Sequence, residues 1–163
     1  MKGNTAIISA LNDLLVYELT AMDQYFVHSR MYEDMGLTKL FERIDHEFDD
    51  EKGHAAVLIE RILFFEGKPD LTKRDGLNIG ATVPEMLQSD LDIEYGVQKA
   101  LKKVMALCEQ EKDYVTRDQL LVLLDDTETD HAYWLEKQLR LIKLTGLQNY
   151  LQSQMLGALS TYP

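Results

Sequence analysis

Two pairs of residues have the types and the spacing that metal chemistry requires: Glu51 with His54, and Glu128 with His131. Positions i and i+3 share one face of a helix, so in each pair the carboxylate and the imidazole can converge on one point. Carboxylate oxygens and imidazole nitrogens both bind divalent transition metals. One Glu-x-x-His alone is a weak signal, because solvent-facing helices carry many, so the surrounding pattern has to decide.

Both pairs interrupt stripes of apolar residues that recur every three or four positions, as the buried face of a helix requires. Glu18 and Glu94 interrupt two further stripes in the same way. The four stripes are Leu11, Leu15, Glu18, Met22 and Tyr25; Leu40, Ile44, Glu47 or Phe48, Glu51, His54, Leu58, Ile62 and Phe65; Val83, Leu87, Leu91, Glu94, Val97 or Gln98, Leu101, Met105 and Cys108; and Leu121, Leu124, Glu128, His131, Leu135, Leu139 and Ile142.

These stripes belong to four long predicted helices, at about 5–35, 38–66, 83–111 and 113–145, and a short fifth helix is expected in 147–159. Thr38 and Thr82 are predicted N-caps, and Gly36, Gly67 and Gly146 follow predicted helix ends. No alternation typical of strands competes with this pattern. The chain is therefore predicted to be all-α and a single domain over residues 1–163.

Loop lengths predict how the helices are connected. The first and second helices, and the third and fourth, are joined by so few residues that each pair must be antiparallel. The segment 67–82 is long enough to return along a helix of about 43 Å, at 1.5 Å per residue. The second and third helices can therefore run parallel, which is the ferritin-like form of the four-helix bundle with one long crossover.

The four glutamates are expected at one level of this bundle, because each lies roughly 17–22 Å from the start of its helix. Four buried carboxylates cannot stay charged and unpaired, and no Lys or Arg interrupts the stripes at that level. Two divalent cations would balance the four charges, and the two imidazoles would complete the ligand set. The sequence thus predicts a two-metal centre formed by six residues: Glu18, Glu51, His54, Glu94, Glu128 and His131.

Composition excludes several classes of function. The net charge of −11 disfavours nucleic acid and anionic membrane surfaces as partners, whereas it suits the attraction of cations. The single cysteine, Cys108, excludes an internal disulfide and a cysteine-based zinc site, and it is expected in the core. Neither a signal peptide nor a membrane span is predicted, so the expected location is the cytoplasm. His28 is expected to be partly exposed.

The six residues resemble the di-iron ligand set of ferritin-like proteins. Short segments along the whole chain extend the resemblance to bacterioferritin: "MKGN" at 1–4, "DQYFVHSR" at 23–30, "LNIG" at 77–80, "DYVTRD" at 113–118 and "GLQNYLQSQ" at 146–154. The resemblance implies an iron-storage protein with ferroxidase activity. Each subunit would bind two irons as its cofactor and substrate, O₂ or H₂O₂ would oxidise Fe(II) to Fe(III), and the ferric mineral would fill a homo-oligomeric shell of 24 subunits.

The resemblance also suggests roles for residues beyond the six ligands. Tyr25 would lie beside the centre and pass an electron, although a core tyrosine with a hydrogen-bonded hydroxyl would fit the same stripe. His46 and Asp50 match an inner-surface iron site, and could equally be solvated surface residues. Asn149 and Gln152 resemble residues that line the family's four-fold channel.

One position departs from the family's pattern. Bacterioferritins bind haem between two subunits through a methionine that directly follows the motif glutamate, and this chain has Lys52 there. A homo-oligomer is therefore expected not to bind haem in the usual way. Co-assembly with a haem-binding bacterioferritin subunit stays open, and the departure puts a ferredoxin that reduces the mineral through haem in doubt.

Two other functions compete with this interpretation. A related di-metal enzyme could share the ligands: a rubrerythrin would need four cysteines for its second iron site, but a manganese catalase is not excluded by the ligands. A purely structural shell subunit is the other alternative. Such a subunit has no need to bury four glutamates, so the six intact ligands argue against it.

Overall fold

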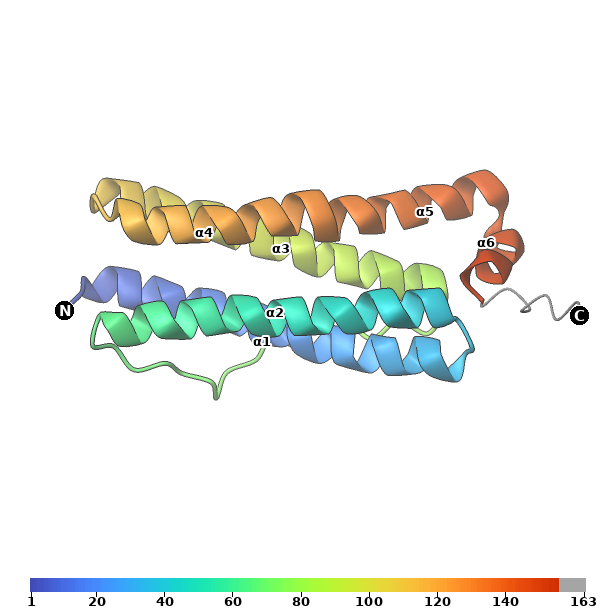
Figure 1. Ribbon diagram of the computed structural model, residues 1–163, viewed down its shortest axis with the longest axis horizontal. Coiled ribbons are helices and arrows are strands. Elements are labelled where there is room, and N and C mark those ends of the chain that lie inside the picture. The colour runs from blue at the N-terminus through green and yellow to red at the C-terminus, as the bar shows by residue number, and fades with distance from the viewer. Residues whose placement is uncertain (156–163) are drawn as a thin grey trace, which may run out of the picture.

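The computed structural model describes residues 1–155 and consists of four helical rods side by side, with a short helix across one end (Figure 1). The described residues contain no strand. The ferritin-like four-helix bundle predicted from the sequence is confirmed. Its elements are α1 (Thr5–Asp34), α2 (Thr38–Phe64), α3 (Val83–Gln110), α4 (Tyr114–Asp126), the π-helical turn η1 (Thr127–Ala132), α5 (Tyr133–Thr145) and α6 (Leu147–Gln154).

Local capping explains where the helices begin. Asn4 caps α1 by accepting the Ala6 N–H at 2.8 Å. Thr82 and Glu85 form a complete capping box at the start of α3, as the predicted cap at Thr82 requires. The predicted cap at Thr38 is wrong: Thr38 is already helical, and the residue before it, Leu37, caps α2 without a side-chain hydrogen bond.

The crossover makes α2 and α3 parallel, as the loop length predicted (Figure 1). A polar stripe on α1 holds this segment. Asn12 accepts the Asp70 N–H at 2.8 Å, Gln24 the Asn78 N–H at 3.0 Å and Thr20 the Asp75 N–H at 3.0 Å. Since these residues lie four or eight positions apart, they share one face of α1, which the crossover follows.

His28 continues this polar stripe and is fully buried, so the expectation that it is partly exposed is wrong. Its Nε2 accepts the Gly80 N–H at 3.3 Å, and its Nδ1 lies 2.8 Å from Oδ1 of Asp90 on α3. The crossover covers the imidazole, which therefore links α1, α3 and the loop.

The core consists of two hydrophobic clusters at different levels of the bundle. Leu15, Leu58 and Leu101 belong to the cluster toward the N-terminus of α1, and Cys108 is buried in the same cluster, as expected. Ala21 and Leu91 belong to the other. Glu18 and Glu94 fall between these levels, so the apolar core is interrupted by a polar layer.

The sequence predicted one continuous α-helix over about 113–145 for the fourth rod. This prediction is wrong, because the rod is interrupted. A π-helical turn separates α4 from α5 at Thr127–Ala132, the segment that contains the second Glu-x-x-His. Single π turns inside α-helices insert an extra residue and are frequent at functional sites. Here the turn changes the direction of the side chains on either side of it.

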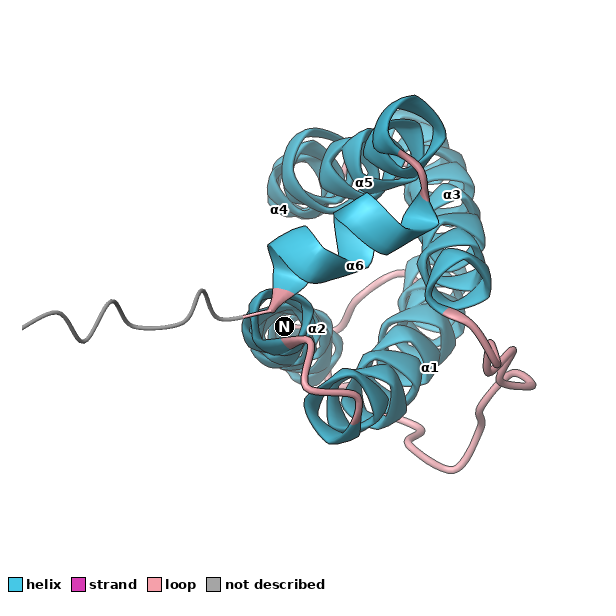
Figure 2. Ribbon diagram, turned by 90° about the vertical axis from the view of Figure 1, so that its right-hand side faces the viewer, coloured by secondary structure: helices cyan, strands magenta, loops and turns pink. Residues whose placement is uncertain are grey.

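Helix α6 closes one end of the bundle, where it crosses between α5 and α2 (Figure 2). Tyr150 anchors it: the ring is buried and its hydroxyl donates to Oε1 of Gln138 at 2.9 Å. The rest of the predicted tail helix lies outside the described residues.

Helix α1 is the one helix of residues 1–155 that is long and apolar enough to cross a membrane by length and composition. Its apolar residues pack in both core clusters, and it carries the buried Glu18. Packing within the bundle accounts for its apolar composition.

Candidate metal centre

Glu51 of α2 is the centre of the polar layer. Its Oε1 lies 3.0 Å from Nδ1 of His131, and its Oε2 lies 3.3 Å from Nδ1 of His54. The two imidazoles are stacked on each other with their ring centroids 5.7 Å apart. One carboxylate thus faces both rings, with one oxygen toward each.

Two further glutamates stand on either side of Glu51. Oε2 of Glu18 is 3.8 Å from Nδ1 of His54, and Oε1 of Glu94 is 3.5 Å from Nδ1 of His131. The ligand atoms of Glu47, Asp50, Asp130 and His131 form one group that does not include Glu51. Two ligand sets share Glu51: one contains Glu18 and His54, the other Glu94 and His131. Each set offers two carboxylates and one imidazole, the donor types that iron, manganese and zinc accept.

The polar layer is closed to solvent. Glu18 and Glu94 are fully buried, and Glu51 is 1% exposed. Both carboxylate oxygens of Glu18, both of Glu47 and one of Glu94 have no hydrogen-bond partner. Buried carboxylates without donors are costly, so these unmet acceptors suit bound cations.

The protonation states show how strongly the groups interact. Burial, together with the charge of Glu51, raises the pKa of Glu18 well above its usual value and that of Glu94 to about 7. Burial alone would lower the pKa of His54, but Glu18 and Glu51 outweigh it and raise that pKa to about 11. Burial opposes protonation of His131 too, yet Glu47, Glu51 and Glu94 raise its pKa further. The carboxylates therefore hold protons on both imidazoles, in the place that cations would take.

Tyr25 lies where the sequence interpretation expected it. Its ring is 1% exposed, and its hydroxyl donates a hydrogen bond to Oε1 of Glu94. Burial and the negative charge of Glu94 raise the pKa of the phenol. This contact fits both roles considered for Tyr25, electron donor and core tyrosine.

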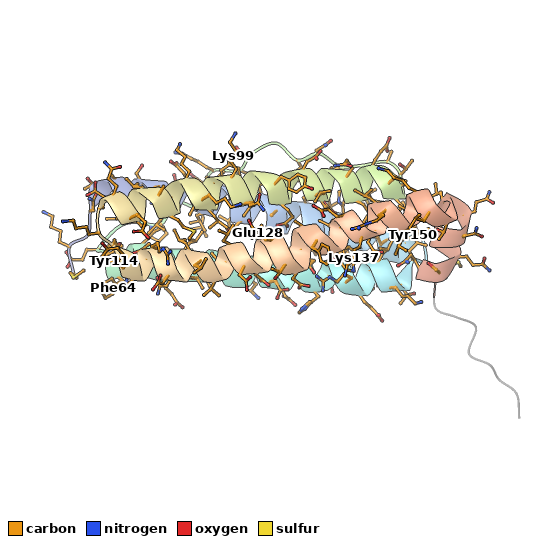
Figure 3. The ribbon with its side chains drawn as sticks, turned by 90° about the horizontal axis from the view of Figure 1, so that it is seen from above. Phe64, Lys99, Tyr114, Glu128, Lys137 and Tyr150 are labelled. Carbon is orange, nitrogen blue, oxygen red and sulfur yellow. The ribbon has the colours of Figure 1, made fainter. Side chains whose placement is uncertain are left out.

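Glu128 is the exception among the six predicted ligands. Its Oε1 lies 2.6 Å from Nζ of Lys102 and accepts from Nε2 of Gln98 at 2.8 Å, and its side chain is 37% exposed. Figure 3 shows it midway along the bundle, beside α3. The structure does not place Glu128 in either ligand set: Glu128 lies in the π turn, and its side chain contacts Lys102 and Gln98 of α3.

Two carboxylates that were not among the predicted ligands also contact the site. Oε2 of Glu47 lies 2.8 Å from Nε2 of His131, and Oδ2 of Asp126 lies 2.9 Å from Nε2 of His54. Glu47 was one of two candidates for its stripe position, and its spacing of four residues before Glu51 was a usable signal. Asp126 had no such signal, since only the π turn brings it to His54.

The remaining candidate residues lie outside the polar layer. His46 is exposed, and its Nε2 is 3.3 Å from Oδ2 of Asp50, which lies 3.9 Å from Nε2 of His131. Lys52 is exposed on α2, and Asn149 and Gln152 are exposed on α6. Their proposed roles stay predictions.

The profile of the ferritin-like domain matches residues 8–145, which span the bundle and every residue of the two ligand sets. The chain belongs to the ferritin family. It is 64% identical over 155 residues to a bacterial ferritin of Synechocystis sp., covering 95% of this chain and 99% of that protein. A bacterial ferritin of Pseudomonas aeruginosa is 56% identical, covering 95% and 100%.

A bacterioferritin of Brucella melitensis is more distant, at 40% identity over 93% of this ferritin-family chain and 94% of the relative. These matches confirm the resemblance drawn from the sequence. They also cover nearly the full length of these relatives.

Proposed function

We propose that this chain is an iron-storage subunit with ferroxidase activity, and that its substrate Fe(II) binds in pairs at the two sets sharing Glu51. One observation carries the proposal: a single buried carboxylate faces two imidazoles, with one further buried carboxylate beside each. A carboxylate shared in this way can hold two cations a few Å apart. The names of the relatives, bacterial ferritins, support iron as the metal.

The reaction follows from the paired arrangement. Each Fe(II) loses one electron on oxidation to Fe(III), so a pair supplies the two electrons that reduce O₂ to H₂O₂, or H₂O₂ to water, with two protons. Carboxylates favour the product because a higher cation charge is stabilised more strongly by anionic oxygens. Tyr25, hydrogen-bonded to Glu94, would be placed to return one electron to an Fe(III) of the pair while its phenol proton passes to that carboxylate.

Glu128 has a conditional part in this proposal. Two Fe(II) bring four positive charges to a layer with three inward-facing carboxylates, Glu18, Glu51 and Glu94. The fourth carboxylate would balance them if it exchanged Lys102 for the iron pair. Since Glu128 lies in the π turn next to His131, a change of its side-chain rotamer is the expected route.

Storage requires an enclosed volume as well as oxidation. Ferritin-family chains form homo-oligomeric shells, and we infer that this chain assembles into one of 24 subunits in the cytoplasm, with the mineral inside. His46 and Asp50 would bind iron on the inner surface, and Asn149 and Gln152 would line a channel. Haem is not expected in a shell of this chain alone, because Lys52 replaces the methionine.

Rapid mixing with Fe(II) in air tests the proposal. The wild-type protein should oxidise about two Fe(II) per subunit in a fast phase. Glu18→Ala should lose that phase, because Glu18 is a ligand of one half of the pair. Glu33→Ala, an exposed glutamate on the same helix, is the matched control and should keep it.

Equal and slow oxidation by wild type and Glu18→Ala would overturn the ferroxidase proposal. A manganese catalase is the alternative that the donor set leaves open. Protein loaded with Mn(II) should then evolve O₂ from H₂O₂ while showing no fast Fe(II) phase, which separates the two activities.

A further inference from the structure

Each histidine of the polar layer touches a carboxylate on its outer side as well as on its inner side. In both rings Nδ1 faces Glu51, and in both rings Nε2 faces away from the centre. Nε2 of His54 is 2.9 Å from Oδ2 of Asp126, and Nε2 of His131 is 2.8 Å from Oε2 of Glu47. The two rings therefore have the same orientation with respect to the centre.

The outer carboxylates are exchanged between two helical rods. Asp126, the last residue of α4, contacts the histidine of α2, and Glu47 of α2 contacts the histidine of η1. Each rod thus supplies one histidine and one carboxylate that contacts the histidine of the other rod. This exchange fixes both ring orientations relative to both rods.

We propose that Asp126 and Glu47 are positioning residues of the two-metal centre: Asp126 is hydrogen-bonded to Nε2 of His54, and Glu47 is ion-paired with Nε2 of His131, so that Nδ1 of each ring is left free to bind metal. The inference rests on the proposed function only in that the polar layer must bind two metal ions. Metal-bound histidines commonly donate their other ring N–H to a carboxylate, which fixes the tautomer and makes the ligand more basic.

The surroundings of Glu47 favour the role of an outer residue. Glu47 is buried, and Nε of Arg43 lies 2.6 Å from its Oε1. The guanidinium of Arg43 also reaches Asp130 at 2.9 Å and lies over the ring of Trp134. This ion pair compensates the charge of Glu47, whose carboxylate also lies in a possible metal group with Asp50, Asp130 and His131.

Asp126 has no such support. Its side chain is 39% exposed, and none of the described residues gives it a cationic partner other than the two imidazoles. The two histidines are therefore held unequally: His131 by a buried carboxylate on an arginine, and His54 by a carboxylate open to solvent. We expect the site of His54 to be the weaker of the two, and the one more sensitive to its outer carboxylate.

Anaerobic titration with Co(II) tests the inference, since Co(II) binds such ligands without turnover and its d–d absorption reports the geometry of each site. Wild type should bind two Co(II) per subunit. Asp126→Ala should weaken one of the two by roughly 10- to 100-fold and change that site's absorption, and Glu47→Gln should weaken the other. Asp125→Ala and Glu42→Gln, exposed neighbours of the same types, are the matched controls and should match wild type.

The outcomes separate the inference from the proposed function. If wild type fails to bind two Co(II), the two-metal site itself is wrong. If wild type binds two and both variants keep wild-type affinities and spectra, the positioning role is overturned while the site stands. If wild type binds a third Co(II) that Glu47→Gln does not bind, then Glu47 is itself a metal ligand, which also overturns the inference. Thermal unfolding of the metal-free variants checks that they are folded.

Discussion

At the scale of single residues, the account depends on the position of Glu51 between two imidazoles. Its burial would raise the pKa of the carboxyl, but contacts with His131 and His54 hold that pKa well below its usual range. Glu51 is thus ionised at neutral pH, while Glu18 and Glu94 are biased toward protonation. The metal-free layer is a network of shared protons, and metal ions must displace them.

Metal binding should therefore release protons. The pKa of His54 is about 11 and that of His131 is also raised, so each ring carries a proton at pH 7 that it must lose to bind metal. We expect release of at least two protons per pair of ions, and affinity that rises with pH. With a pKa of about 7, Glu94 should add to this slope between about pH 6 and 8.

Calorimetric titration with Zn(II) in two buffers of different ionisation enthalpy measures this release. Glu33→Ala should leave the count unchanged, because Glu33 is exposed on α1 and pairs with Arg30 outside the polar layer. The same heat in both buffers would mean that no protons are released, contrary to the protonation states described above.

Most residues of the polar layer could be predicted from the sequence, with two exceptions, Glu128 and Asp126. Glu18, Glu51, His54, Glu94 and His131 could be placed at one level because helical spacing and helix length are regular. Glu128 obeyed the same rule and still turned outward, because side-chain direction inside a π turn does not follow the α-helical period. Asp126 could not be found for the same reason.

At the scale of helices, the long crossover distinguishes this bundle from one with short connections only. Four of its backbone N–H groups donate to the polar stripe of α1, which ends at His28. The sequence predicted the crossover from its length, but not the burial of His28. A histidine on the edge of a helix gives no periodic signal, and the loop that covers it cannot be placed from spacing.

Replacing His28 by leucine should destabilise the protein, because Asp90 would then be buried with only Gln24 as a donor. The expected cost is about 3 kcal/mol, since a buried carboxylate loses its partner. The double variant His28→Leu/Asp90→Leu should recover part of this loss, because no buried charge remains. Thermal unfolding of the metal-free protein measures both variants, with His46→Ala as an exposed control.

Stability of His28→Leu equal to wild type would contradict this account of the crossover. A double variant less stable than the single one would also contradict it, since the cost would then come from lost packing and not from the unpaired Asp90.

At the scale of the whole molecule, the acidic character of the chain suits its proposed cargo. A net charge of −11 raises the local concentration of cations around each subunit. The bundle itself was predictable from the sequence, because four long amphipathic stripes with two short loops and one long one allow few arrangements. Assembly is a different matter, since subunit contacts involve exposed side chains that carry no period.

Lys52 provides a test at this scale. If haem is absent because an ammonium replaces a thioether, then Lys52→Met should restore haem binding between paired subunits, seen as a haem absorption band that co-elutes with the assembled protein. Glu60→Met, another exposed position on α2, is the control and should remain colourless. Haem bound by the wild-type shell would contradict the prediction.

The most direct test of the central claim is anomalous X-ray scattering from crystals soaked anaerobically in Fe(II). The account predicts two iron peaks per subunit, one on each side of the Glu51 carboxylate, the first beside Glu18 and His54 and the second beside Glu94 and His131. Both peaks should vanish in Glu51→Ala. A subunit interior without iron, or a single peak that survives the loss of Glu51, would contradict it.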